Sequence, residues 1–128
     1  MAYRVFVDAD VLIAAFQGEG QLRERALAVL SLPLVEFWYN PLLRMEVTIQ
    51  PAYQRHSSEL AFYNTYFSNA TCYGNLNQMF ELGYAEGMKH GIAVVDALHV
   101  ATAHLAKCAV LATAERDTKP MFRTQSSL

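Results

Sequence analysis

Charged residues are scarce in this sequence, and those of positive sign are not in excess. Only 17% of the 128 residues are charged, and the formal net charge is -2. Proteins that hold nucleic acids through a basic surface carry an excess of lysine and arginine, so the overall charge gives no indication of such a partner. The segment beyond Leu105 is locally basic, which fits a solvated stretch as well as a phosphate-contacting rim.

Cysteine and long apolar runs are also scarce. The two cysteines, Cys72 and Cys108, lack the spacing of metal ligands, so we expect both to be reduced and buried as small apolar side chains. No segment approaches the roughly 20 apolar residues that cross a membrane, and the N-terminus lacks the features of a signal peptide. We therefore expect a cytoplasmic protein without a membrane segment.

Apolar residues are abundant, at 53% of the sequence. A chain of this length and composition buries one sizeable core. We therefore expect a single domain over residues 1–128, with a flexible end of a few residues.

Short apolar segments alternate with amphipathic ones along the chain. Asn40 followed by Pro41 predicts a helix start, and Pro51 is expected to end that helix. Strands alternating with helices predict an α/β fold whose mainly parallel sheet is covered on both faces. The predicted strands are 3–7, 34–39, 70–73 and 109–113, and the predicted helices are 11–16, 21–30, 41–50, 57–69, 76–90 and 93–108.

Two acids, Asp8 and Asp10, follow the first predicted strand. Parallel sheets bind their ligands at the carboxyl ends of their strands, so both are candidates for a site. Each is also a candidate helix N-cap, whose carboxylate accepts the free N–H groups of the first turn. For Asp10 we favour the cap, whereas for Asp8 both interpretations stay open.

Glu46 lies on an apolar stripe of its predicted helix, four residues after Leu42 and three before Ile49. We expect an acid at this position to face inward, where it needs a cation or hydrogen bonds. The alternative is a place at the edge of the stripe, beside Arg44 or another base.

Acids recur near the later helices and strands. Asp96 begins an alanine-rich helix, where an acid also interacts favourably with the helix dipole. Thr113, Glu115 and Asp117 form a polar cluster after the last predicted strand, a composition that is also typical of a solvated loop.

Four of the acids fall at strand ends or near helix starts that a parallel sheet brings together: Asp8, Glu46, Asp96 and Glu115. Converging carboxylates without matching bases repel one another, and a divalent cation relieves that repulsion. Oxygen ligands suit Mg²⁺ or Mn²⁺, and these ions in an acidic cleft suit phosphate chemistry.

The segments that carry these acids resemble the PIN domain, the nuclease fold of VapC-type toxins. VFVDADVLIAAF resembles the family's opening strand, acid and helix, with Asp8 as the first acid. NPLLRMEVTIQ matches the region of the second acid, at Glu46. VVDALHVATAHLAKCAVLAT is similar to the third segment, with Asp96, and LATAERDTKPMF resembles the closing one, where Thr113 precedes Glu115.

The resemblance implies a three-layer α/β/α sandwich with a mainly parallel sheet, and endonucleolytic cleavage of RNA with Mg²⁺ or Mn²⁺. It also implies an antitoxin protein as a partner and a homodimer. Asp8, Asp96 and Glu115 would bind the metal, and Glu46 would be the remaining catalytic acid.

Other residues receive supporting roles from the resemblance. Thr113 would support the site by hydrogen bonding. Asp10 stands where the family usually has Ser, Thr or Asn, and Asp117 is a substitute candidate for Glu115. His99, three residues after Asp96, is expected to be a packed or capping histidine.

Three alternatives compete with the nuclease. An apolar strand followed by Asp8 and Asp10 also opens haloacid-dehalogenase-type phosphatases, where the first acid is a nucleophile and the second a general acid/base. A phosphoacceptor receiver domain would need a further Asp and a late Lys, which the sequence does not clearly supply. A PIN-like domain without activity could serve in RNA or protein binding.

Overall fold

Four parallel strands form the central sheet of the structure, a computed structural model that describes residues 2–114. The strands are β1 (Tyr3–Val7), β2 (Val35–Tyr39), β3 (Thr71–Cys72) and β4 (Val110–Ala112). Their order is β3-β2-β1-β4, and every neighbouring pair is parallel. β1 therefore lies inside the sheet, and its end is flanked by the ends of β2 and β4.

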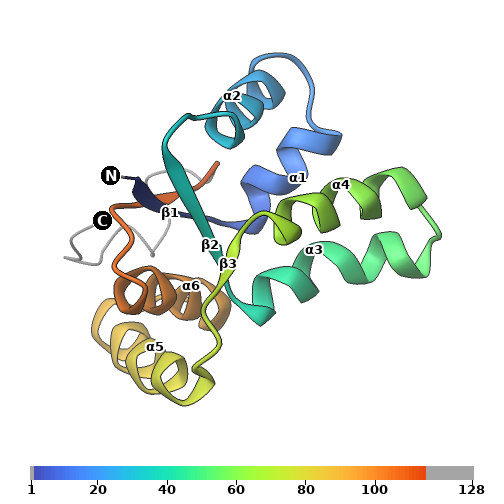
Figure 1. Ribbon diagram of the computed structural model, residues 1–128. Helices are drawn as coiled ribbons and strands as arrows, with labels where there is room; N and C mark the ends of the chain where they lie inside the picture. Colours follow the sequence, from blue (N-terminus) through green and yellow to red (C-terminus); the bar gives the residue numbers. More distant parts are fainter. Residues whose placement is uncertain (1, 115–128) are drawn as a thin grey trace.

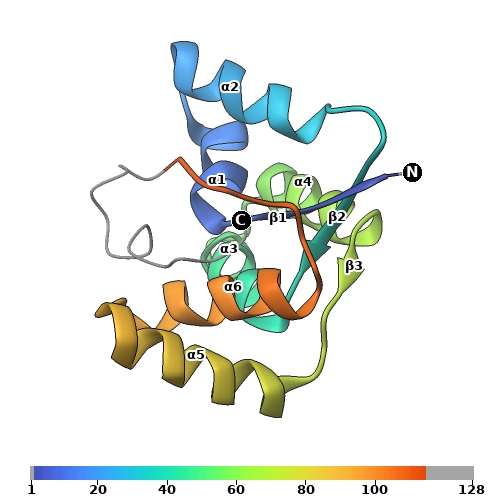
Figure 2. The same cartoon turned by 90° about the vertical axis from the view of Figure 1, so that its left-hand side faces the viewer.

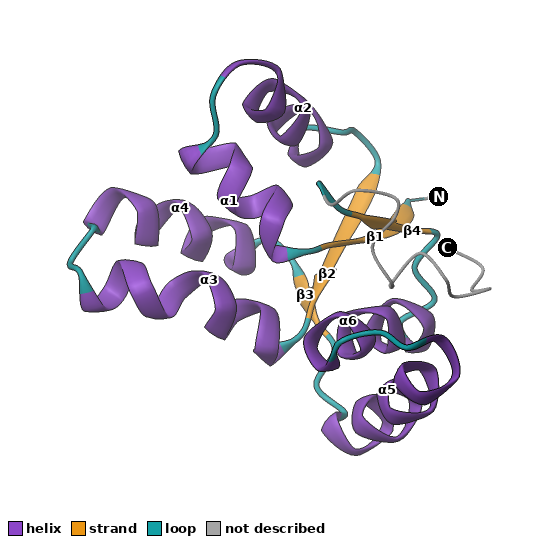
Figure 3. Ribbon diagram, turned by 180° about the vertical axis from the view of Figure 1, so that it is seen from behind, coloured by secondary structure: helices purple, strands orange, loops and turns teal. Residues whose placement is uncertain are grey.

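Helices cover both faces of this sheet (Figures 1 and 2). α1, α2 and α4 lie on one side, with α3 packed along α4, while α6 covers the other face and α5 packs on α6 (Figure 3). The predicted three-layer α/β/α fold with a parallel sheet is therefore confirmed. The helices are α1 (Ala9–Gln17), α2 (Gly20–Leu30), α3 (Pro41–Tyr53), α4 (Ser57–Ser68), α5 (Leu76–His90) and α6 (Val94–Leu105).

The C-terminal part of β1 is buried on both faces, as expected for a strand between two helical layers. Val5, Phe6 and Val7 are at most 4% exposed. The ring of Phe6 packs at a tilt against His99 of α6, with the ring centroids 5.1 Å apart. Because strand side chains alternate, Phe6 and Asp8 project toward the α6 side of the sheet.

The prediction that Pro51 ends its helix is wrong, because α3 continues to Tyr53. A proline this close to a helix end removes only one backbone hydrogen bond, and Pro51 is buried. The chain leaves the helix through later bonds, from Gln54 N–H to Gln50 O (2.9 Å) and from His56 N–H to Pro51 O (2.9 Å).

The burial of the two cysteines and of α4 differs from residue to residue. Cys72 and Cys108 are both free, and Cys108 is buried as expected. Cys72 is exposed, against the prediction, because it lies in the short edge strand β3. The aromatic helix α4 contributes Tyr63 and Phe67 to the core. Across residues 2–114, no helix is long and apolar enough to cross a membrane.

Candidate functional site

Asp8 directly follows β1 and caps α1. It is 5% exposed, and its Oδ1 accepts a hydrogen bond from the Val11 N–H at 3.3 Å. Its own backbone N–H donates to Ala112 O at 3.0 Å. This second bond fixes Asp8 beside the end of β4, so two carboxyl ends of the sheet meet at this residue.

Asp10 is not the helix cap that the sequence suggested. α1 begins at Ala9 rather than at Val11, so the preceding residue, Asp8, takes the cap position. Asp10 lies in the first turn and lines an open pocket of about 380 Å³ together with Gln17 and Ala114.

α6 places Asp96 at the same edge of the sheet. Arg4, near the start of β1, donates to Ala106 O at the C-terminal end of α6 (2.9 Å), and Phe6 packs on His99. The helix and the strand therefore run antiparallel. Asp96 lies about 4.5 Å beyond His99 along the helix, and Asp8 lies about 6.6 Å beyond Phe6 along the strand in the same direction.

Asp96 is thus a half-buried acid of the first helical turn, as predicted, and it does not cap α6. The N-cap position belongs to Ala93, which has no side-chain cap bond. An acid in the first turn interacts favourably with the helix dipole. This interaction with the helix dipole leaves Asp96 a candidate for a functional site at the carboxyl edge of the sheet.

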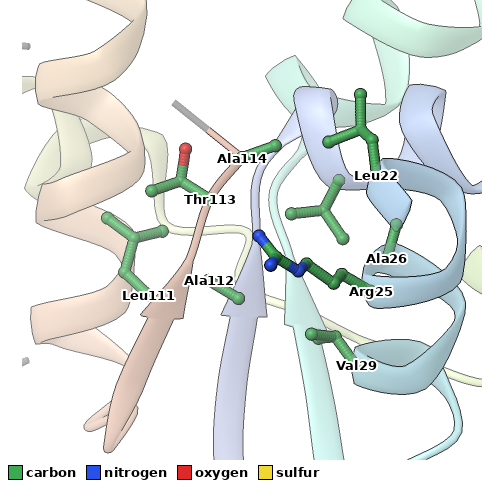
Figure 4. A pocket seen from close by; sticks show the side chains of 9 residues that line it. Leu22, Arg25, Ala26, Val29, Leu111, Ala112, Thr113 and Ala114 are labelled. Atoms are coloured by element: carbon green, nitrogen blue, oxygen red, sulfur yellow. The ribbon is translucent and has the colours of Figure 1, made fainter. Parts of the chain in front are cut away.

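Thr113 follows β4 on the side of α6. Figure 4 shows Thr113 and Leu111 pointing to one side of the strand and Ala112 to the other. Leu111 packs against a cluster that includes Val100 of α6. Ala112 faces a pocket of about 490 Å³ between β4 and α2, across which Arg25 extends.

Glu46 does not face inward as expected. The buried face of α3 is formed by Leu43, Val47 and Pro51, and the Glu46 side chain, 34% exposed, lies at its edge. The structure therefore favours the edge position, but the partner is not Arg44. Oε1 of Glu46 lies 2.5 Å from Nε2 of His99, which joins α3 to α6 one helical turn from Asp96.

The histidine that binds Glu46 belongs to a buried polar cluster. His99 is 1% exposed and Asn40, directly after β2, is fully buried. The Asn40 amide nitrogen lies 3.2 Å from His99 Nδ1 and donates to Thr102 Oγ1 at 2.8 Å. His99 was expected only to pack or cap. The sequence could have indicated this pair, because a histidine and a glutamate that are both expected to face the core each need a hydrogen-bond partner.

The donor set at this edge suits Mg²⁺ or Mn²⁺, because Asp8, Glu46 and Asp96 offer oxygen atoms only. Among residues 2–114, no three His, Cys, Asp or Glu side chains form a group that could hold a metal ion. Mg²⁺ usually keeps several waters and takes only one or two carboxylates, so its binding does not require a group of three such side chains. Glu115 and Asp117, together with the predicted flexible end, lie outside the described residues.

Comparisons with known proteins address the fold. No family model matches the chain, and no curated protein matches it. A chain of a toxin-antitoxin complex from Klebsiella pneumoniae superposes with a TM-score of 0.67, covering 90% of this chain and 88% of that chain at 16% identity. The chain shares that fold. FitAcB from Neisseria gonorrhoeae gives a TM-score of 0.55, covering 93% of this chain and 91% of that one at 21% identity.

Proposed function

We propose that this protein is a metal-dependent endoribonuclease of the PIN domain family and the toxin of a toxin-antitoxin pair. The proposal is supported most by two contacts: Asp8 bonds to the end of β4, and Glu46 contacts His99 one helical turn from Asp96. The likeness of the fold to chains from toxin-antitoxin complexes supports it.

In this proposal Asp8, Asp96 and Glu115 bind Mg²⁺ or Mn²⁺, and Glu46 orients the attacking water. The ion, when bound, polarises a phosphoryl oxygen and lowers the pKa of a bound water. Thr113 supports the acids by hydrogen bonding. Asp10 is a further supporting acid, and Asp117 is the substitute candidate for Glu115.

The phosphatase alternative receives less support. It requires Asp8 and Asp10 to act on one phosphate group. Asp8 is 5% exposed and caps α1, and Asp10 lines a pocket with Gln17 and Ala114. The pocket that Asp10 lines does not include Asp8, whereas the phosphatase needs both acids at one phosphate group.

A cleavage assay with charge-neutral variants tests the proposal. The purified chain is incubated with structured and unstructured RNA, with Mn²⁺, with Mg²⁺ and with a chelator. Asp8→Asn suits this test because asparagine caps a helix as well as aspartate does, so the fold is kept while the carboxylate is lost. We expect Asp8→Asn and Asp96→Asn to lower the cleavage rate by about 10² to 10⁴-fold.

The matched control is Glu81→Gln, which neutralises an exposed acid of α5 and should cleave as the wild type does. Cleavage that persists in chelator, or that survives both aspartate substitutions, would falsify the nuclease proposal. Metal-dependent hydrolysis of a small phosphate ester that is lost in Asp10→Asn would favour the phosphatase instead.

We also propose an antitoxin protein and a second copy of this chain as partners. The fold shared with chains of toxin-antitoxin complexes supports the antitoxin, and the resemblance to PIN domains is the basis for the homodimer. Light scattering of the purified chain measures the oligomeric state. Co-expression with the product of a small neighbouring gene, followed by co-purification and loss of RNA cleavage, tests the antitoxin.

A further inference from the structure

The contact between Glu46 and His99 gives the candidate site a part that the acids alone do not explain. The Glu46 side chain is 34% exposed, whereas His99 is almost completely buried. An exposed glutamate on a helix surface samples several rotamers. A donor fixed in the core restricts this sampling, because the carboxylate must keep Oε1 on the histidine.

The hydrogen bonds of Asn40 decide which nitrogen of His99 carries the proton. Oδ1 of Asn40 accepts from the Leu43 N–H at 2.8 Å as the cap of α3. The amide group of Asn40 therefore turns to the opposite side, toward Thr102 Oγ1 at 2.8 Å and His99 Nδ1 at 3.2 Å.

The hydrogen bonds of Thr102 complete the assignment of the His99 proton. The Thr102 hydroxyl donates to Leu98 O at 2.8 Å, so Oγ1 is an acceptor for Asn40. One amide hydrogen of Asn40 goes to Thr102 and the other to His99. Nδ1 of His99 must then be an acceptor, which leaves the single proton of a neutral imidazole on Nε2. That proton points at Oε1 of Glu46, 2.5 Å away.

We propose that His99 is a positioning residue that holds the Glu46 carboxylate through Nε2–H, in a tautomer set by Asn40. Phe6 supports the imidazole ring from β1, with the ring centroids 5.1 Å apart. With Oε1 held, Oε2 of Glu46 is the oxygen directed to water at the site. This inference rests on the proposed nuclease function for its consequence, and on the contacts of Asn40 for its geometry.

The first test is a spectrum of the histidine itself. The full chain is labelled with ¹⁵N at its histidines and kept free of metal. Its two-bond nitrogen–proton correlations report which ring nitrogen carries the proton. We expect His99 to show a protonated Nε2 and an unprotonated Nδ1. A proton on Nδ1 overturns the proposal, whether or not the protein cleaves RNA.

The second test compares two substitutions of the ring. His99→Phe keeps an aromatic ring beside Phe6 but removes the donor, whereas the amide nitrogen of His99→Gln reaches the position of Nε2. Loss of a partner that orients an active-site residue typically costs about 10- to 100-fold in activity. We expect His99→Phe to lose that much kcat with little change in KM for RNA, and His99→Gln to recover most of it.

The matched control is His90→Phe. His90 pairs with Glu86 on α5 at 3.3 Å, so this variant also breaks a histidine–glutamate pair but leaves the site intact, and it should keep wild-type cleavage. Carbon relaxation of the Glu46 side chain adds a readout that needs no activity. Glu46 should be ordered in the wild type and in His99→Gln, and mobile in His99→Phe.

These readouts separate the two proposals. A wild-type chain that cleaves no RNA, but shows the Nε2–H tautomer and an ordered Glu46, overturns the nuclease and supports the positioning role. A chain that cleaves RNA while Glu46 stays ordered in His99→Phe supports the nuclease and overturns the positioning role. Equal kcat in His99→Phe and the wild type also overturns it.

Discussion

Asn40 performs two tasks with one side chain. Its carbonyl oxygen caps α3 through the Leu43 N–H, and its amide hydrogens serve His99 and Thr102 in the core. The cap was visible in the sequence, since Asn before Pro is a typical helix start. The second task was not, because His99 and Thr102 lie 59 and 62 residues away.

We expect Asn40→Ala to lower the free energy of unfolding by about 2–4 kcal/mol. The substitution removes a helix cap and leaves buried polar groups without their hydrogen-bond partner. Asn75→Ala is the control, since Asn75 caps α5 through the Gln78 N–H on an exposed surface. It should cost about 1 kcal/mol. Urea unfolding measures both, and equal losses would contradict the second task of Asn40.

The two cysteines should differ in reactivity. Burial raises the pKa of Cys108 to about 12, and the thiolate is the reactive form. Cys72 is exposed. We expect iodoacetamide to alkylate Cys72 in the native protein and to leave Cys108 unmodified until urea is added. Mass spectrometry of digested samples measures the alkylation of each cysteine. Labelling of Cys108 in the native protein would contradict its buried position.

At the scale of elements, small residues set the distance between α5 and α6. The alanine-rich sequence of α6 allows close helix packing, and α5 contributes Gly83, which is buried against α6. A Cβ at Gly83 would lie 2.8 Å from Leu98 Cδ2, whereas one at Gly87 would meet its neighbours at 3.5 Å or more. Because α6 carries Asp96 and His99, this packing also supports the candidate site.

This difference predicts opposite outcomes for two alanine substitutions in one helix. Gly87→Ala should stabilise the protein by about 0.5–1 kcal/mol, because alanine is the better helix former. Gly83→Ala gains the same propensity but crowds Leu98, and it should be less stable than Gly87→Ala by about 1–2 kcal/mol. Thermal unfolding of the two variants checks the prediction. The close approach of α5 and α6 would be contradicted by equal stabilities.

At the scale of the whole molecule, several groups that ionise at alkaline pH lie in the core. Burial raises the pKa of Tyr63 and Tyr66 above their ordinary value of 10.0, and that of Cys108 from 9.0 to about 12. The unfolded chain ionises these groups first. The stability that they contribute is therefore complete below the unfolded value of 9.0 and is lost as pH rises toward 12.

We expect the free energy of unfolding to fall steadily above about pH 9. The Tyr66 hydroxyl is buried and, among residues 2–114, has no hydrogen-bond partner. Tyr66→Phe should therefore raise stability by about 1 kcal/mol and reduce the alkaline loss. Tyr84→Phe is the control, because Tyr84 is 70% exposed. Urea titrations across this pH range test both, and an unchanged pH dependence in Tyr66→Phe would contradict the assignment.

The fold was predictable in most of its parts, and the candidate site in fewer. Strand and helix positions follow from local patterns, and their alternation led to the parallel sheet. The errors arose where the position of a residue depends on contacts with other elements of the fold. Asp10 was favoured as a cap because the predicted helix began too late. Glu46 was placed on an inward stripe with Leu42 and Ile49, yet the core accepts Leu43 and Val47 instead.

The sequence by itself determined the order of the elements, the parallel sheet and the place of Asp8 directly after β1, because these follow from short-range periodicity and chain connectivity. Only the tertiary structure decided the partner of Glu46 and the capping role of Asp8. Each depends on where one helix starts or lies against another, and such contacts join residues far apart in the chain. Of Asp8 and Asp10, the fold sets Asp8 beside the end of β4 and directs Asp10 to a separate pocket.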